Sequence, residues 1–409
     1  VIEYMPLVNE AIEMASHQPE SVVVLERPQA DYQLIAGRDY SYVDLMGSVN
    51  SIGCVPVSAT HPLYILYTSG TTGKPKGVVR DNGGHAVAMA YSMQAVYDMK
   101  PGEVFWAASD VGWVVGHSYI VYAPLLFGCT TVLYEGKPVR TPDAGAFWRV
   151  IEEYKVKVIF SAPTAFRAIR KEDPNNEHYE KYDTSSLEAL YLAGERLDPP
   201  TYYWLNELTQ LPVIDHWWQT ETGWAIASDP RGIESFPPKA GSATRPSPGF
   251  CVEIFDPNGN PVAVGEQGSV VIKRPLPPSC LTTIWGNHAR CEESYLNTYE
   301  GYYLTGDGGF IDTDGYIFIM GRMDDVINVA GHRLSTGEME EVLAGHHSVA
   351  ECAVIGVSDE LKGQLPVGLV VLKDGITSSR ESVESELIGA IRNRVGALAC
   401  FNKALIVKR

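Results

Sequence analysis

The sequence predicts an α/β fold, and three observations lead to it. Strand-like and helix-like segments alternate over residues 86–215, which is typical of βαβ units and of mostly parallel sheets flanked by helices. Proline-rich loops follow, and apolar segments on either side of Asn258-Gly259 predict the antiparallel strands of a small β-subdomain. Beyond it the pattern changes again, to a short α+β region. We therefore expect a large N-terminal domain, residues 1–323, and a small C-terminal domain, residues 324–409.

Each expected element rests on the spacing of its apolar residues. Helices are expected over residues 7–14, 39–52, 86–97, 118–127, 143–154, 337–343 and 381–395. Strands are expected over residues 22–25, 63–67, 104–107, 130–134, 156–160, 189–193, 213–215, 251–255, 269–273, 315–320, 326–329, 352–357, 368–372 and 404–407. Parallel sheets bind their ligands beyond the carboxyl ends of the strands. We therefore expect the motifs that follow these strands to share one crevice.

The composition argues against several classes of protein. A chain of 409 residues that is 45% hydrophobic can bury a large core and more than one domain. A formal net charge of −18 disfavours nucleic acids and anionic membranes as partners. The seven cysteines are scattered without a Cys-x-x-Cys pair, which argues against a zinc site or disulfide framework and favours a reducing compartment. No apolar run approaches the ~20 residues that a membrane-spanning helix needs.

A loop rich in glycine, hydroxyl and lysine side chains follows the expected strand at 63–67. Glycines let the backbone direct several N–H groups at one point, and such clustered donors form an anion-binding nest. The loop residues that we expect to hold a polyphosphate are Thr68, Ser69, Gly70, Thr71, Thr72, Gly73, Lys74 and Lys76. A surface turn of the same composition is the alternative. The loop is not a Walker A motif, because Pro75 stands where a serine or threonine should hold magnesium.

The second motif, residues 215–223, follows the expected strand at 213–215. Trp217 offers a flat face to a purine, and Glu221 offers a hard oxygen ligand for Mg²⁺ on phosphates. An aromatic core cluster next to a capped helix start is the alternative. A glutamate among tryptophans would be costly to bury without a cation or a partner, which favours the ligand interpretation.

Shorter motifs occur along the rest of the chain. They are Gly194-Glu195-Arg196, Thr305-Gly306-Asp307, Gly321-Arg322-Met323-Asp324-Asp325 and Val329-Ala330-Gly331-His332-Arg333. Each is weak alone, because tight turns and solvated arginines have the same composition. Carboxylates suit paired ribose hydroxyls, and a guanidinium pairs with phosphate in a bidentate manner.

These motifs, in this order, resemble those of the adenylate-forming enzymes, which include acyl-CoA synthetases, luciferases and peptide-synthetase adenylation domains. The match extends from Tyr64 to Arg409. Residues 110–119 and the pair Trp217-Trp218 resemble the acetyl- and propionyl-CoA synthetases in particular. The resemblance implies ATP, Mg²⁺ and coenzyme A as cofactor and substrates, and the expected partners are small molecules, with the oligomeric state left open. It also implies that the C-terminal domain is mobile and rotates about Asp324.

Residue roles follow from the same resemblance. The nucleotide set comprises the loop residues Thr68 to Lys74, with Gly194, Glu195, Arg196, Asp215, His216, Trp217, Trp218, Gln219, Thr220, Asp307, Arg322 and Arg333. The expected catalytic residues are Thr220, Glu221, Arg333 and Lys76, and Glu221 is the expected Mg²⁺ ligand. Ala330 and Gly331 match the strip beside the CoA thiol, while His346 and Val349 match a structural cation site. Most relatives carry proline where this chain has Arg196, so that detail departs from the family pattern.

The acyl pocket implied by the resemblance is small. Trp218 blocks it in the acetyl- and propionyl-CoA synthetases, and Val114, Val115 and Ala193 form the remaining wall. Acetate-preferring members usually have valine where this chain has Ala193. The lost bulk leaves room for one more carbon, and one methylene is worth ~1–3 kcal/mol of discrimination. We therefore expect propionate to be preferred over acetate.

Other expectations concern the ends of the chain and rival functions. The catalytic lysine of the superfamily follows a strand like 404–407, and this chain ends before such a motif. Few residues precede the glycine loop, so we expect a fragment impaired in adenylation. The rivals are an adenylating enzyme that does not use CoA, a nucleotide-binding regulatory or inert fragment, and a phosphotransferase, which is disfavoured because no kinase motif set is present. The expected compartment is the mitochondrial matrix, with the cytosol second.

Overall fold

The structure is a computed structural model of the chain. It describes residues 3–68, 75–323, 327–329, 332–359, 362–373, 375–376 and 378–407, and only the main chain at residues 328, 332 and 333. The chain folds into two compact units, Val1–Val57 and Ser58–Arg409, and each is described by itself. No helix in the described residues is both long enough and apolar enough to cross a bilayer.

The first unit contains two helices and a parallel pair of short strands. The elements are α1 (Tyr4–Met14), β1 (Val22–Val24), β2 (Asp39–Ser41) and α2 (Tyr42–Ser48). Val22 pairs with Asp39 in the β1–β2 register. The carboxylate of Asp39 also accepts the backbone N–H of Ile35 at 2.9 Å and pairs with Arg38 at 2.5 Å. The hydrogen bond from Arg38 lowers the pKa of Asp39, so this carboxylate stays ionised.

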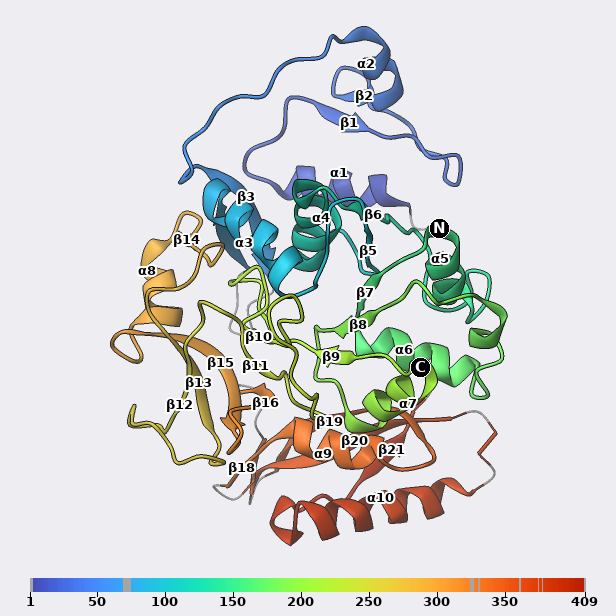
Figure 1. Cartoon of the computed structure of the whole chain (residues 1–409), viewed down its shortest axis with the longest axis vertical. Coiled ribbons are helices and arrows are strands. Elements are labelled where there is room, and N and C mark those ends of the chain that lie inside the picture. The colour runs from blue at the N-terminus through green and yellow to red at the C-terminus, as the bar shows by residue number, and fades with distance from the viewer. Residues whose placement is uncertain are drawn as a thin grey trace. The chain divides into compact units, whose positions relative to one another are not determined.

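A five-stranded parallel sheet of order β6-β5-β7-β8-β9 forms the centre of the second unit (Figure 1). Alternate residues of its strands enter two different cores. Phe105, Phe160 and Tyr191 face one core, and Trp106 and Ile159 face the other. Because both faces are covered, β5, β7 and β8 consist almost entirely of apolar residues. The strands are β5 (Val104–Ala107), β6 (Thr130–Thr131), β7 (Val158–Ser161), β8 (Ala189–Leu192) and β9 (Val213–Asp215).

Helices cover both faces of this sheet. The core that contains Phe105 is completed by α3 (Asn82–Ala95), the π-helical segment η1 (Gly116–Tyr122) and α4 (Ala123–Phe127). The opposite core is completed by α5 (Ala146–Tyr154), α6 (Pro163–Glu172) and α7 (Pro199–Thr209), with the short 3₁₀ turn η2 (Tyr179–Lys181) beside them. Figure 1 shows these two groups of helices on opposite sides of the sheet.

The glycine loop is flanked by an antiparallel hairpin. Strands β3 (Pro62–Thr68) and β4 (Lys76–Asp81) pair with Thr68 opposite Lys76, and β14 (Thr283–Ile284) extends the sheet on the far side of β4. The residues between them, 69–74, lie outside the described residues. The expected strand at 63–67 is therefore confirmed, and its partner strand begins at Lys76.

The β-subdomain is a four-stranded antiparallel sheet of order β12-β13-β15-β16. Its strands are β12 (Val252–Phe255), β13 (Gly268–Lys273), β15 (Tyr302–Ile311) and β16 (Ile317–Arg322). Side chains alternate along β15, so Tyr303, Thr305 and Asp307 are all buried on one face. Smaller elements nearby are β10 (Ala227–Ser228), β11 (Arg245–Pro246), α8 (His288–Cys291) and the π-helical η3 (Glu292–Leu296).

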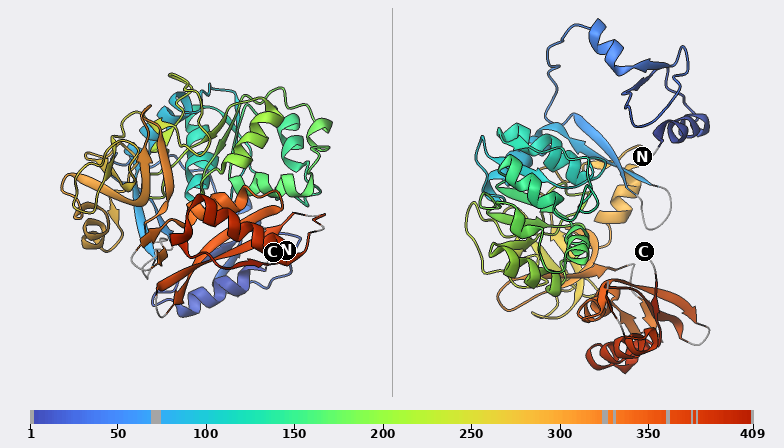
Figure 2. Two further views of the ribbon diagram at one scale, coloured as in Figure 1. Left: turned by 90° about the horizontal axis from the view of Figure 1, so that it is seen from below. Right: turned by 90° about the vertical axis from the view of Figure 1, so that its right-hand side faces the viewer.

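The C-terminal region has a core of its own. Strands β17 (Ile327–Val329), β18 (His332–Leu334), β19 (Val349–Asp359), β20 (Gly363–Leu372) and β21 (Ala404–Ile406) form one mixed sheet. The helices α9 (Thr336–Ala344) and α10 (Arg380–Arg394) pack apolar residues against it, and a 3₁₀ turn, η4 (Ala397–Ala399), precedes the last strand. Figure 2 shows α10 lying along this sheet.

Three of the expected elements differ from the structure, and α6, α7 and β15 were not expected at all. A helix over 39–52 was wrong at its start, because residues 39–41 pair with β1 and Ser41 then caps α2, accepting a hydrogen bond from the N–H of Asp44. The helix expected over 118–127 begins at Gly116 and is π-helical in its first part. The strand expected over 130–134 pairs only at Thr130 and Thr131. The remaining expected elements are present, with ends shifted by a few residues.

Candidate active site

The carboxyl ends of three parallel strands open onto a single cavity of about 590 Å³. Ser161 comes from the end of β7, Gly194 follows β8 and Asp215 ends β9. The β-subdomain closes another side with Asp307 and Arg322. The motifs that follow β8 and β9 therefore share one crevice with Asp307 and Arg322, as expected, whereas the expectation stays a prediction for the glycine loop. The predicted residues that line it are Val114, Val115, Ala193, Gly194, Glu195, Arg196, Asp215, His216, Trp217, Trp218, Gln219, Thr220, Asp307 and Arg322.

Asp307 is a buried carboxylate in the cavity that is held by several neighbours. Its Oδ2 accepts the indole N–H of Trp217 at 3.1 Å and the amide N–H of Gln219 at 2.7 Å. A guanidinium nitrogen of Arg322 lies 3.5 Å from Oδ1. Burial raises the pKa of Asp307 to about 6, while the Arg322 charge opposes that rise. Near neutral pH the group is thus mostly ionised and can accept hydrogen bonds from ligand hydroxyls.

Gln219 is held in one orientation by its neighbours. Its amide nitrogen also donates to the Thr305 carbonyl at 2.8 Å, and its oxygen accepts the hydroxyl of Tyr303 at 3.0 Å. Tyr303 is fully buried. A phenol that donates to the amide oxygen directs the NH₂ group towards Asp307.

Asp215 and His216 line the cavity in different ways. Burial raises the pKa of Asp215 to about 7, and its only described hydrogen bond comes from the N–H of Leu197 at 3.2 Å. The ring of His216 is buried, donates from Nδ1 to the Leu192 carbonyl at 2.8 Å, and accepts the Tyr97 hydroxyl at 3.1 Å. Burial lowers the pKa of His216 to about 4, so the ring stays neutral. Protein groups thus occupy both of its nitrogens.

The four predicted acyl residues all line this cavity. Trp218 is packed edge-to-face against Tyr119 at 5.6 Å and tilted against Phe160 at 5.9 Å, as measured between ring centroids. Tyr119 and Phe160 belong to the core of the parallel sheet, which leaves the indole little room to move. Val114, Val115 and Ala193 line the same cavity. The residues predicted to bound the acyl pocket therefore share one cavity, and their role as an acyl pocket stays a prediction.

Glu195 and Arg196 line the cavity, but their charged groups pair with residues outside its lining. The carboxylate of Glu195 accepts the N–H of Thr164 at 2.6 Å at the start of α6 and pairs with Arg167 at 2.6 Å. Arg196 forms an ion pair of 2.7 Å with Glu341 of α9. The departure from proline at position 196 thus supplies a cation that reaches an element of the C-terminal region.

The side chain of Arg80 is fully buried and binds the main chain of Thr220 and Glu221. Its guanidinium donates to the carbonyl of Glu221 at 3.1 Å and to the carbonyls of Thr220 and Ser279. The Arg80 Nε donates to the hydroxyl of Tyr64 at 3.3 Å. Arg80 therefore fixes the main chain of the motif without touching the cavity.

The carboxylate of Glu221 lies in a short hydrogen-bonded chain. The ammonium of Lys76 donates to the Tyr295 hydroxyl at 2.6 Å, and that hydroxyl donates to Oε1 of Glu221 at 2.5 Å. Lys76 Nζ is 3.6 Å from the same oxygen. Burial raises the pKa of Tyr295, so its hydroxyl remains protonated. Lys76 and Glu221, predicted from two distant motifs, are therefore brought together.

Sequence reasoning missed several residues around this site, among them Arg80, Tyr303, Tyr295 and Trp113. Arg80 ends the glycine-loop stretch but carried no motif of its own, and Tyr303 precedes the Thr305 motif on the same face of β15. Tyr295 lies in a segment without recognisable spacing, and the only available signal was a tyrosine among charged residues. Trp113, also missed, lines the cavity next to Val114.

Several predicted residues cannot be placed. The loop residues Ser69, Gly70, Thr71, Thr72, Gly73 and Lys74 lie outside the described residues, as do Asp324, Ala330 and Gly331. Only the main chain of Arg333 is described, opposite Asn328 in the β17–β18 hairpin. Thr68 ends β3 at the edge of the loop. Their roles remain predictions.

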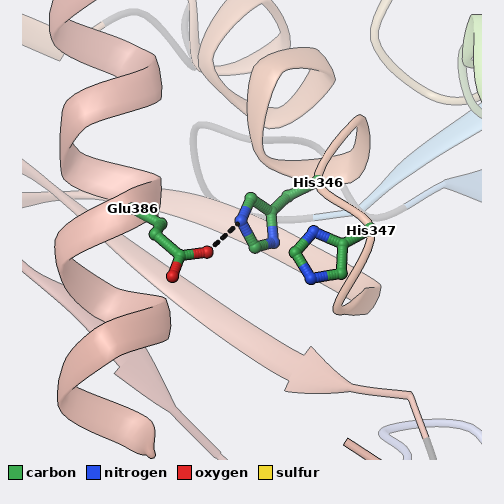
Figure 3. Close-up of side chains that lie close together, drawn as sticks. All are labelled: His346, His347 and Glu386. Atoms are coloured by element: carbon green, nitrogen blue, oxygen red, sulfur yellow. Dashed lines mark hydrogen bonds and ion pairs between the residues drawn. The ribbon is translucent and has the colours of Figure 1, made fainter. Parts of the chain in front are cut away.

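The predicted cation position at His346 has nearby ligand atoms. Figure 3 shows His346, His347 and Glu386, whose candidate ligand atoms all lie within 4.8 Å of one another. His346 Nε2 lies 3.0 Å from Glu386, and its Nδ1 accepts the N–H of Ser348 at 3.3 Å. This pattern places the ring proton on Nε2, facing Glu386. Val349 has an aliphatic side chain without a ligand atom, and this side chain packs in the C-terminal core.

Comparison with known proteins places the chain in a family. A model of the AMP-binding enzyme family matches residues 6–280, and one of the AMP-binding enzyme C-terminal domain matches residues 338–409. The chain belongs to the AMP-binding enzyme family. A solved anthranilate CoA ligase, AuaEII, in complex with anthranoyl-AMP, has the same fold, with a TM-score of 0.84 at 23% identity. That comparison covers 99% of this chain and 73% of the ligase, and it confirms the predicted α/β fold class.

The curated relatives of this AMP-binding chain are much more similar in sequence. An uncharacterized protein of Pseudomonas aeruginosa is 58% identical over the whole chain and 65% of its own length. The mouse mitochondrial acyl-CoA synthetase short-chain family member 3 is 48% identical over the whole chain and 60% of its own length. The propionate–CoA ligase of Escherichia coli is 47% identical over 97% of this chain and 64% of its own. The chain thus spans somewhat less than two thirds of each relative.

Proposed function

We propose that the protein is a short-chain acyl-CoA synthetase. It would activate propionate or acetate with ATP to an acyl-adenylate, release pyrophosphate, and pass the acyl group to coenzyme A, giving the acyl-CoA and AMP. One observation carries the proposal. Among the described residues, most of those predicted for the nucleotide and all four predicted for a small acyl group line one cavity. A nucleotide bound beside Asp307 would thereby place its phosphates near a pocket that ends at Trp218.

The reaction explains why the residues that bind the nucleotide and those that bind the acyl group must line the same cavity. A carboxylate is a poor electrophile for a thiol because oxide is a poor leaving group, and an adenylate provides a better one. The carboxylate of the acid is already ionised, so its attack on the α-phosphate needs no base. The protein then needs to orient two anions and to stabilise their charge. Asp307 is positioned to accept ribose hydroxyls, and the predicted partners of the phosphates are Lys76, Thr220 and Arg333.

A divalent cation fits beside Glu221. Its carboxylate is largely buried, with a side-chain exposure of 13%, and only Oε1 receives a hydrogen bond from the described residues. Mg²⁺ commonly takes one or two carboxylates together with substrate phosphates and water. When bound, such an ion would neutralise charge on the phosphates.

The acyl substrate is proposed to be very short. Trp218 is packed against Tyr119 and Phe160, so it cannot swing away to lengthen the pocket. Ala193 is nearly fully buried and lines the same cavity. A small side chain there favours one carbon more than acetate, which supports propionate. The Escherichia coli relative, a propionate–CoA ligase, supports the same choice.

Domain organisation and compartment belong to the same proposal. The C-terminal domain is proposed to comprise residues 324–409 and to rotate about Asp324, with Ala330 and Gly331 beside the CoA thiol. Mitochondrial names among the relatives, such as the mouse protein, support the mitochondrial matrix, whereas the Pseudomonas aeruginosa and Escherichia coli relatives are bacterial. The remaining partners are proposed to be small molecules alone.

The test is a substrate panel with free coenzyme A. Thioester formation and pyrophosphate release are measured with acetate, propionate, butyrate and hexanoate. We expect propionate to give the highest kcat/KM, and Trp218→Gly to shift the preference towards the longer acids. Val115→Ala, which opens the side wall instead of the end, is the matched control. Pyrophosphate exchange without thioester would favour an adenylating enzyme that does not use CoA, and a clear acetate preference would contradict the propionate assignment.

A further inference from the structure

The hydroxyl of Tyr295 bridges two predicted phosphate-site residues that lie far apart in the sequence. Lys76 donates to it at 2.6 Å, and it donates to Oε1 of Glu221 at 2.5 Å. We propose that Tyr295 is a positioning residue that holds the Glu221 carboxylate in the orientation required to bind the divalent cation of ATP. This inference rests on the proposed function, and it adds to it a residue outside the predicted motifs.

The direction of the two hydrogen bonds follows from the donors available. An ammonium group has three donors and no acceptor, so Lys76 can only donate. The Tyr295 hydroxyl must therefore accept from Lys76 and direct its own proton to Glu221. A hydrogen bond to an ionised acceptor is short and roughly twice as strong as a neutral one. The 2.5 Å separation agrees with that arrangement.

The ring of Tyr295 is itself fixed. It lies in η3 and stacks on Tyr303, with a centroid distance of 5.3 Å and an interplanar angle of 10°. Both rings are buried. Their hydroxyls bind two residues of one motif, since Tyr303 donates to Gln219 and Tyr295 donates to Glu221. Each tyrosine of the stacked pair therefore orients a different side chain of the motif.

The bridge determines which carboxylate oxygen is available. Oε1 of Glu221 is engaged by Tyr295, whereas no described residue donates a hydrogen bond to Oε2. The carboxylate can then offer one oxygen to a cation and keep its orientation through the other. Tyr295 also lies between the two charges and keeps Lys76 Nζ at 3.6 Å from Oε1. Without the hydroxyl, Lys76 can approach the carboxylate and compete with the cation.

The stacked pair supplies matched variants, because each substitution by phenylalanine removes one buried hydroxyl. ATP binding is measured by calorimetry and by tryptophan fluorescence, first in EDTA and then during a titration with MgCl₂. For Tyr295→Phe we expect ATP affinity in EDTA to stay within about twofold and half-saturating Mg²⁺ to rise about tenfold, as for a lost charge-assisted hydrogen bond. For Tyr303→Phe we expect weaker ATP binding in EDTA and little change in half-saturating Mg²⁺.

A second variant leaves Tyr295 intact. Glu221→Asp shortens the side chain by one methylene and withdraws the carboxylate from the Tyr295 hydroxyl, so it should raise half-saturating Mg²⁺ in the same way. The double variant should add little to either single change, because both break the same contact. Unchanged half-saturating Mg²⁺ in either folded variant, or additive effects, would overturn the proposal. If the unaltered chain binds no ATP under either condition, the proposed function itself fails.

Discussion

Arg80 shows how a residue outside the cavity can define it. Its guanidinium is fully buried and bound by main-chain carbonyls of Thr220, Glu221 and Ser279. The planar fork of arginine can reach several acceptors at once, whereas a lysine ammonium is a single point charge. A buried charge of this kind is tolerated only because its donors are satisfied.

Replacing Arg80 should therefore loosen the motif at 219–221. We expect Arg80→Met to lower the free energy of unfolding by about 2–4 kcal/mol, because three carbonyls lose their donors. Arg80→Lys should be intermediate. Urea denaturation measures both, and Arg149→Met, which removes an exposed arginine paired with Glu153, is the control. An Arg80→Met variant as stable as this control would contradict the role given to Arg80.

Asp215 should make stability depend on pH in an unusual direction. Its pKa is raised by burial from 3.8 to about 7 in the folded chain. Between these values the unfolded chain has released this proton while the folded chain keeps it, so the free energy of unfolding falls as pH rises. Above about pH 7 Asp215 is ionised in both the folded and the unfolded chain, and the free energy of unfolding no longer falls further on its account.

Asp215→Asn removes this titration while keeping an oxygen for the N–H of Leu197. We expect the variant to be more stable than the wild type by about 1–3 kcal/mol at pH 8 and equal to it near pH 4. Thermal unfolding from pH 4 to 8 provides the measurement. Parallel pH profiles for the two proteins would show that Asp215 is already ionised in the fold.

Some residues of the site were predictable from the sequence, and others were not. Glu221 was found because a carboxylate beside tryptophans is costly to bury without a cation or a partner, whereas Asp307, which lies within β15, was found through the resemblance to a family motif. Arg80, Tyr295 and Tyr303 were missed because their partners are main-chain carbonyls or side chains far away in the sequence. Such contacts depend on tertiary packing, which no local pattern encodes.

At the scale of elements, the cavity depends on turns at the ends of strands. Gly194 follows β8 with φ +94°, and Gly223 ends the motif after β9 with φ +77°. Both glycines have a left-handed backbone conformation, but the space around them differs. A Cβ on Gly194 would meet nothing within 4 Å, whereas one on Gly223 would meet Ser279 Oγ at 2.7 Å and Arg80 Cζ at 2.8 Å.

The two alanine variants separate strain from crowding. We expect Gly194→Ala to lower the free energy of unfolding by about 1–2 kcal/mol, the usual cost of a left-handed residue. Gly223→Ala should cost at least twice as much, because the Arg80 guanidinium must also move. Urea midpoints of the two variants give the comparison, and equal losses would mean that Arg80 adapts at no cost.

Element prediction succeeded where packing and local pattern agree. The strands at 104–107 and 213–215 were located to the residue, because apolar runs between polar turns define buried parallel strands. It failed over 39–52, where pairing with β1 and the Ser41 cap divide the segment into a strand and a helix. The π-helical start at Gly116 was not foreseen either, since π and α segments have similar composition.

At the scale of the whole molecule, the fold class was predictable but the division into units was not. Alternation of helices and strands led directly to the five-stranded parallel sheet of the second unit. The boundary between the two units at Val57 was not predicted, because no change in amino-acid composition indicated it. The boundary expected near residue 324 remains a prediction, because it lies among residues that the structure does not describe.

Limited proteolysis addresses the boundary at Val57. The segment before it has no regular structure, and Ile52 and Val55 are 90% and 76% exposed. Thermolysin, which cleaves before bulky apolar residues, should cut here first and leave a stable product that begins near residue 52 or 55. The buried Met89 and Met93 of α3 should resist cleavage. Mass spectrometry identifies the product, and earlier cleavage within residues 84–323 would contradict the division.

The alternating face of β15 has one more consequence. Tyr303, Thr305 and Asp307 project to the same side only because each lies two positions after the one before it. Adding or deleting a single amino acid upstream in this strand would invert the whole row, turning three interior groups outward together. Genetic variation in the length of this strand should therefore be far less tolerated than point changes in it.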